Sequence, residues 1–163
     1  MTSQVTSGTI PDRHLYAAVA HLVLDDADAM IRFCGEAFGA RPEVRVQGAG
    51  GEVLHAELRL GGSVVIVCDA IEGDGLLRTP VTDAWSGVGS GEALRVFVPD
   101  VDALTERAVA AGAELLQAPA DMFYGERTSV LRDPKGHTWV LRANRSGAPA
   151  GQPAGRDGES LAA

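Results

Sequence analysis

The feature of this chain that most constrains its fold is an internal duplication. The segments LVLDDADAMIRFCGEAFGA (22–40) and VFVPDVDALTERAVAAGA (96–113) each begin as an apolar strand, continue through a D-x-D-A motif and end in Gly-Ala. The two motifs begin 74 residues apart, and the two Gly-Ala pairs lie 73 residues apart. A repeat at a nearly constant offset predicts two modules of one design.

Each copy carries the start and stop signals of a helix. Asp26 and Asp100 are suited to N-cap positions, where a carboxylate accepts hydrogen bonds from the first backbone N–H groups. Gly39 and Gly112 are suited to the left-handed position that follows a last turn. Apolar residues recur with helical spacing, at positions 30, 31, 34, 37 and 38 in one copy and 101, 104, 108 and 111 in the other. Each helix is therefore expected to bury one face.

Three strand-like runs follow each predicted helix. The runs are 41–47, 52–60 and 63–68 in the first half, and 113–118, 126–132 and 137–143 in the second. Gly61-Gly62 joins the last two runs of the first half and predicts a two-residue hairpin. A D-P-K-G turn joins the last two runs of the second half. Each half therefore reads β-α-β-β-β, which gives an α+β fold class.

The charge of the chain argues against two classes of partner. With 14 basic and 22 acidic residues the net charge is −8, whereas nucleic acids and anionic membranes both attract basic surfaces. No apolar run reaches the length of a membrane span. The start, MTSQVTSGTIPDR, lacks the apolar core of a signal peptide, so a cytoplasmic protein is expected. Cys34 and Cys68 have no metal-type spacing and are expected to be buried, reduced thiols.

Composition also sets the expected boundaries. Residues 1–13 and 144–163 are predicted to be disordered, the latter because it is rich in Gly, Ala, Pro and Ser and lacks periodicity. Residues 14–143 then form one domain, with module one at 14–68, a connecting or lid loop at 69–92 and module two at 93–143. The length of the loop is compatible with modules that pair within one chain or swap between two chains.

Four segments in this order resemble a known superfamily. They are DDADAMIRFCGEAFGA, VLHAELRLGGSVVIV, VPDVDALTERAVAAGA and YGERTSVLRDPKGHTWVL. Together they make residues 15–143 similar to the vicinal oxygen chelate superfamily, also called the glyoxalase/bleomycin-resistance/dioxygenase fold, and most similar to its PhnB-like branch. The resemblance implies paired βαβββ modules that form curled mixed sheets around a cavity, helices on the outer face, and a homodimer.

The resemblance also indicates where metal-dependent members keep their ligands. Four positions hold His, Glu or Gln in those members, and they match Val19, Ile66, Ala93 and Val140 here. None of these four side chains can donate a lone pair to a metal. The lyase, isomerase and dioxygenase activities of the superfamily depend on such an ion. We therefore expect no metal and no other cofactor.

Strand alternation predicts which side chains face the cavity. If Val140 faces inward, His137 and Trp139 point to the helix-packed side, which makes His137 part of the scaffold. Leu54, Ala56, Leu58 and Leu60 are expected in the core. The inward set comprises Val19, His21 and Val23; His55, Glu57 and Arg59; Ala93, Arg95 and Phe97; Arg127, Ser129 and Leu131; and Thr138, Val140 and Arg142. The charged members of this set are alternatively expected to pair with one another, across the cavity or a dimer interface.

Two loops add aromatic side chains. Trp85 lies in the loop 69–92, and Tyr124 lies in the loop 120–126 with Met122 and Phe123, where the four could stack on a ligand or pack against a partner. The predicted ligand-binding residues are His21, His55, Glu57, Arg59, Trp85, Arg95, Phe97, Tyr124, Arg127, Thr138, Val140 and Arg142. No catalytic residue is assigned.

Apolar walls with a few polar groups are typical of a small-molecule site. The favoured hypothesis is a metal-free protein that sequesters an aromatic natural product or antibiotic in a cleft formed with a dimer partner. One alternative is a lyase or isomerase that uses a relocated metal site at His21, His55 and Glu57, or metal-free acid–base chemistry at Glu57 or His55. Another is an interaction module without a small ligand.

Overall fold

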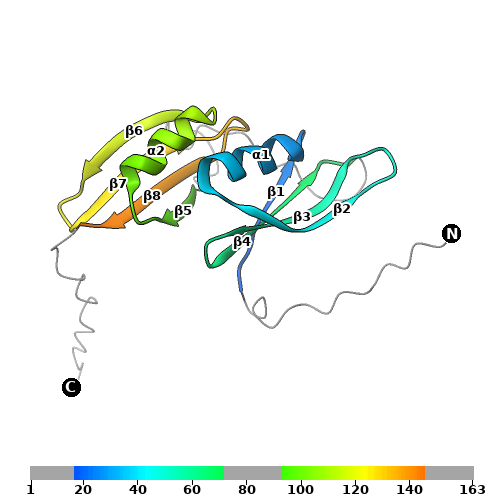
Figure 1. Ribbon diagram of the computed structural model, residues 1–163, viewed down its shortest axis with the longest axis horizontal. Coiled ribbons are helices and arrows are strands. Elements are labelled where there is room, and N and C mark those ends of the chain that lie inside the picture. The colour runs from blue at the N-terminus through cyan, green and yellow to red at the C-terminus, as the bar shows by residue number, and fades with distance from the viewer. Residues whose placement is uncertain (1–16, 72–92, 146–163) are drawn as a thin grey trace, which may run out of the picture. The chain divides into compact units, whose positions relative to one another are not determined.

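The computed structural model describes residues 17–71 and 93–145, which carry two helices and eight strands (Figure 1). The first part contains β1 (Ala20–Leu24), α1 (Ala27–Phe38), β2 (Arg41–Gln47), β3 (Val53–Leu60) and β4 (Ser63–Asp69). The second contains β5 (Ala93–Phe97), α2 (Val101–Ala110), β6 (Glu114–Asp121), β7 (Glu126–Arg132) and β8 (Thr138–Asn144). Residues 1–13, which were predicted to be disordered, lie outside the described residues. The same holds for nearly all of the predicted disordered tail at 144–163 and for most of the predicted loop at 69–92.

The two halves have the same topology. The first sheet has the order β1-β4-β3-β2, and the second has the order β5-β8-β7-β6. The pairs β1/β4 and β5/β8 are parallel, and every other pair is antiparallel. The predicted β-α-β-β-β order and the α+β class are confirmed. By internal contacts, residues 17–31 and 40–71 form a first unit, and residues 32–39 and 93–145 form a second. Within the described residues, no helix is both long and apolar enough to cross a membrane.

Both helices begin and end where the repeated motif predicts. The Oδ1 atom of Asp26 accepts a hydrogen bond from the backbone N of Ala29 at 2.9 Å. In the second copy, Asp100 Oδ1 accepts from the N of Ala103 at 3.0 Å. After the helices the chain turns at glycines 39 and 112, whose φ angles of 70° and 108° lie in the left-handed region that favours glycine.

The first unit buries one face of its sheet. Leu22 and Leu24 of β1 lie on the same face as Leu58 of β3 and Val67 of β4, and all four are buried. At the end of β4 the carboxylate of Asp69 accepts backbone hydrogen bonds from Ala27 and Val53, each at 2.7 Å. One side chain therefore holds the start of α1 and the start of β3 together.

The second unit packs α2 against its sheet, chiefly against β6 and β7 (Figure 1). The hydroxyl of Thr105 on α2 lies 2.7 Å from that of Ser129 on β7, and both residues are buried. The second half of α1 belongs to this unit, where the ring of Phe38 lies 4.6 Å from that of Trp139. Trp139 is buried, as predicted.

The hairpin between β3 and β4 has the predicted register. Leu60 pairs with Ser63, Glu57 with Ile66, and Arg59 with Val64. One expected core position at the start of β3 is wrong, because Leu54 is 39% exposed. The pairing of β2 with β3 shifts between Val46 and Gln47, so that Val53 rather than Leu54 is buried.

The hairpin between β7 and β8 differs from the prediction by one residue. The backbone N of Asp133 donates to the carbonyl of His137 at 2.9 Å, so the loop contains three residues, 134–136, and ends at Gly136 with φ 94°. A three-residue loop with a left-handed glycine is a common hairpin connection. As a result, the side chains of β7 face the opposite sides from those predicted. Ser129 pairs with Leu141 and Leu131 with Trp139, on the side that α2 covers. Arg127, Ser129 and Leu131 do not face the same side as Val140, and Thr128, Val130 and Arg132 do.

Candidate functional site

The open face of the second sheet, defined as the side opposite α2, collects several predicted site residues. Ala93, Arg95 and Phe97 of β5 pair with Thr138, Val140 and Arg142 of β8, so the predicted facing of both strands is confirmed. Thr138 is buried, Val140 is half-buried and Arg95 is exposed. The face is therefore mixed, with apolar side chains such as Val140 beside polar ones such as Thr138 and Arg95.

Three aromatic side chains stand exposed at one end of this face. Phe97 is 71% exposed, Tyr124 is 48% exposed and Phe123 is fully exposed. The guanidinium carbon of Arg142 lies 5.9 Å from the ring centroid of Phe97 and 5.6 Å from that of Tyr124. The Phe123 and Tyr124 rings meet edge to face at 5.0 Å. We call Phe97, Phe123, Tyr124 and Arg142 the aromatic–arginine cluster.

Glutamates neutralise two of the three arginines on this face. Arg142 forms an ion pair with Glu126, and Arg132 pairs with Glu114 at 3.2 Å. Within the described part of the chain, Arg95 makes no ion pair. Glu126, Thr128, Val130 and Arg132 were missed as face residues, because the predicted strand parity was wrong. The signal that finds them is Gly136, whose place after D-P-K is typical of a three-residue loop.

Arg127 was predicted to face the cavity, but it lies on the other side of the sheet. Its guanidinium binds both oxygens of Asp102 on α2, at 2.5 and 2.7 Å, and Asp121 on β6 at 2.9 Å. These bonds lower the pKa of Asp102 and raise that of Arg127. The predicted orientation is wrong, and these contacts make Arg127 a link between the helix and the sheet edge.

The open face of the first sheet carries the other predicted residues, and they interact in pairs. His55 Nε2 lies 3.3 Å from Glu57 Oε1, and His21 Nε2 lies 3.3 Å from Cys68 Sγ. Partial burial, and then the nearby charge of His55, lowers the pKa of His21. At neutral pH His21 is therefore held in its uncharged form.

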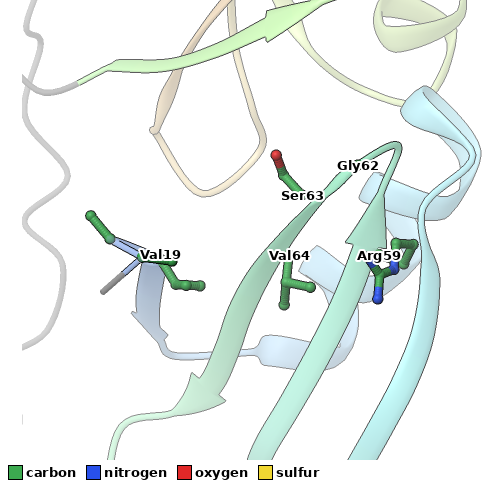
Figure 2. A pocket seen from close by; sticks show the side chains of 7 residues that line it. Val19, Arg59, Gly62, Ser63 and Val64 are labelled. Carbon is green, nitrogen blue, oxygen red and sulfur yellow. The ribbon is translucent and has the colours of Figure 1, made fainter. Parts of the chain in front are cut away.

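A small pocket lies beside Gly62 and Ser63, where the turn between β3 and β4 leads into β4 (Figure 2). Val19, Val64 and Arg59 line it, and its volume is about 160 Å³. Sites for drug-sized ligands have about 300–1,000 Å³. The guanidinium of Arg59 is also bound by both oxygens of Glu43, at 2.9 and 2.7 Å. The pocket therefore suits only a small chemical group.

His137 belongs to the scaffold, as predicted. Its Nδ1 lies 3.0 Å from the carboxylate of Asp133, which also accepts hydrogen bonds from the backbone of Lys135 and from Trp139 Nε1 at 2.8 Å. The side chain of Asp133 is completely buried. The same carboxylate and, more strongly, burial raise the pKa of Cys34 to about 12. Both cysteines are buried and neither forms a disulfide, as expected.

Comparisons with known proteins agree with this architecture. Residues 15–141 match the family described as the Glyoxalase/Bleomycin resistance protein/Dioxygenase superfamily. The chain belongs to this superfamily. The predicted place in its PhnB-like branch stays a prediction.

Three similar proteins illustrate the range of the superfamily. An uncharacterized protein of Mycobacterium tuberculosis is 38% identical over 123 residues, which cover 74% of this chain and 70% of that protein. TioX from Micromonospora sp. ML1 has a crystal structure with 28% identity and a TM-score of 0.60, covering 82% of this chain and 99% of TioX. A glyoxalase-related enzyme from Fulvimarina pelagi has 26% identity and a TM-score of 0.62, covering 85% of this chain and 98% of that one.

The donor set for the superfamily's metal does not fit here. The positions that the resemblance assigns to the metal ligands are Val19, Ile66, Ala93 and Val140, and their hydrocarbon side chains offer no lone pairs. No group of three or more His, Cys, Asp or Glu residues within 17–71 and 93–145 is arranged to hold a metal ion, and this includes His21, His55 and Glu57. The described residues therefore do not fit the superfamily's metal ion. Trp85, the remaining predicted site residue, lies outside the described residues.

Proposed function

We propose that this protein binds and sequesters a planar aromatic small molecule, without a metal ion, on the open face of the second sheet. The observation that carries the proposal is the aromatic–arginine cluster. Three large aromatic side chains exposed at one place form an apolar patch of the kind that marks a binding surface. Aromatic rings favour offset or edge-to-face stacking on other rings, and Arg142 adds a cation–π contribution.

The cluster suits binding better than catalysis. Phe97, Phe123 and Tyr124 offer contact area, and Arg142 is already paired with Glu126. The superfamily's name includes bleomycin resistance proteins, which supports a role in sequestering a natural product or antibiotic. We further propose that a second copy of the chain covers part of this face, as a homodimer, and completes the cleft.

A thermal-shift and fluorescence screen tests the proposal. A panel of planar polycyclic compounds, including anthraquinones and phenazines, is titrated into the full chain. A ligand at 100 times its dissociation constant stabilises the folded state by about 2.7 kcal/mol, which raises the melting temperature. Binding should also change the fluorescence of Trp85 or Trp139.

Matched variants then locate the site. Phe97→Ala should weaken binding by about 1–2 kcal/mol, or about five- to thirtyfold, because a stacked ring is lost. Val109→Ala removes an exposed apolar side chain from α2 and should leave binding unchanged. A panel that yields no shift, or a hit that binds both variants equally, contradicts the proposal.

Metal-free acid–base chemistry is a second candidate function. It is favoured by the contact between His55 and Glu57, and by the nearby His21, whose lowered pKa leaves its imidazole unprotonated at neutral pH. The similarity to a protein described as a glyoxalase-related enzyme also supports it. Once a substrate is found, Glu57→Gln should lower its turnover by about a hundredfold or more. Unchanged turnover would eliminate Glu57 as the base.

A further inference from the structure

The open face of the second sheet is locally positive in a chain that is strongly acidic. The net charge of the whole chain is −8. On this face the described charged residues are three arginines, at 95, 132 and 142, against two glutamates, at 114 and 126, which leaves a net charge of +1. A site of this sign attracts anions that the remainder of the surface repels.

The surplus charge can be assigned to one residue. Arg142 is paired with Glu126 and Arg132 with Glu114. Arg95 is exposed and has no ion pair with any residue of 17–71 or 93–145. Among the described residues none competes for its guanidinium donors, which a ligand can therefore engage. Guanidinium groups bind carboxylates through two parallel hydrogen bonds, and these bonds are stronger than those between neutral groups.

The position of Arg95 places this charge beside the aromatic platform. Arg95 and Phe97 lie two residues apart on β5 and face the same side, a separation of roughly 6–7 Å along the strand. Arg95 stands opposite Val140, and Phe97 stands opposite Arg142. A ring stacked on Phe97 would therefore have Arg95 within reach of a substituent that points along β5.

We propose that the molecule bound here is a planar aromatic anion, whose ring stacks on Phe97 and whose carboxylate or other acidic group is held by Arg95. This inference rests on the proposed aromatic-binding function and adds the charge of the ligand. An aromatic cation would meet the surplus positive charge of the face, and a neutral compound would leave Arg95 without a partner.

Three probes of the same shape test the charge. 2-Naphthoate, its neutral amide 2-naphthamide and the cation 2-naphthylmethylammonium are titrated into the full chain, with dissociation constants measured by ligand-observed NMR. 2-Naphthoate should bind about three- to tenfold more tightly than 2-naphthamide. The cation should bind most weakly. At 1 M salt the preference for the anion should shrink, since charges are then screened within about 3 Å.

Two charge-removing variants assign the effect. Arg95→Gln should abolish the preference for 2-naphthoate and leave the affinity for 2-naphthamide unchanged. Arg32→Gln removes the same charge from an exposed position on α1 and should keep the preference. Arg95→Lys should retain part of it, because the charge remains while the two-pronged geometry is lost.

The outcomes separate the two proposals. If 2-naphthoate and 2-naphthamide bind equally and both weaken in Phe97→Ala, the anion is overturned and aromatic binding stands. A preference for 2-naphthoate that persists in Arg95→Gln also overturns the assignment to Arg95. If none of the three probes binds, or if Phe97→Ala binds them all as tightly as the parent chain, the aromatic site itself is overturned.

Discussion

The two modules share a scaffold and differ in the faces they leave open. Both have the same strand order, an aspartate N-cap and a left-handed glycine after the helix. The open face of the first sheet carries pairs of polar groups such as His55 with Glu57, whereas that of the second carries the aromatic–arginine cluster. The two modules thus share the residues that direct folding and differ in the side chains of their open faces.

The largest predicted loss of stability distinguishes side chains on the covered faces of the sheets from those on the open faces. Leu58→Ala in the first sheet and Leu141→Ala in the second remove buried side chains, and each should lower the free energy of unfolding by about 2–5 kcal/mol. Phe97→Ala should change it by less than about 0.5 kcal/mol, since Phe97 is largely exposed. Urea titrations measure all three. A large loss in Phe97→Ala would mean that the cluster supports the fold.

Two carboxylates that accept backbone hydrogen bonds, the half-buried Asp69 and the buried Asp133, allow a comparison between the modules. Asp133→Asn weakens acceptors for His137, Lys135 and Trp139, and should cost about 2–4 kcal/mol of unfolding free energy. Asp69→Asn retains one oxygen for two backbone donors and should cost about 1–2 kcal/mol. The same urea titration serves for both. Equal losses would show that the number of bonds at each carboxylate does not set its contribution.

The two hairpin turns should differ in their tolerance of a side chain. Gly136 has a φ of 94°, so Gly136→Ala is strained and should cost about 1–2 kcal/mol. Gly62 lies outside the left-handed region, and a Cβ added there meets open space, so Gly62→Ala should be nearly neutral. Thermal unfolding of both variants provides the measurement, and a neutral Gly136→Ala would contradict the three-residue loop.

The smallest predicted effect is the contribution of His21, in the first module, to the pH dependence of stability. Because folding lowers the pKa of His21 below its usual 6.5, the unfolded chain binds a proton more readily, and stability falls as the pH drops from about 6.5 through the folded pKa. His21→Gln should flatten this part of the stability profile. His137→Gln is not a suitable control because it disturbs Asp133, whereas Arg32→Gln should leave the slope unchanged. A slope unaffected by His21→Gln would assign the loss to other groups.

Much of the scaffold could be predicted because its signals are local. Asp26, Asp100, Gly39 and Gly112 act within a few residues, and the Gly61–Gly62 turn sets the β3/β4 register directly. Long-range choices were harder. The bulge that buries Val53 instead of Leu54 arises from pairing with β2, which alternation within β3 cannot reveal.

The candidate site could be predicted only in part. The prediction that Arg95, Phe97 and Arg142 share one face of the sheet was correct, because β5 and β8 pair without a bulge. Arg127 was placed on the wrong side because a single residue in the D-P-K-G loop decides the parity of β7. Partners such as Glu43, Glu126 and Cys68 escaped notice, since nothing in the local sequence marks which charge or thiol a neighbouring strand will bring near.

The short loop at 134–136 controls more than the path of the chain. Deleting or adding one residue there would exchange Thr128, Val130 and Arg132 for Arg127, Ser129 and Leu131 on the open face, and would push the first set under α2. Such a change would bury Arg132 and break the contact between Ser129 and Thr105. Insertions and deletions at this hairpin are therefore expected to be far more damaging than ordinary surface-loop changes, so the open face can be diversified by substitution and not by a change of loop length.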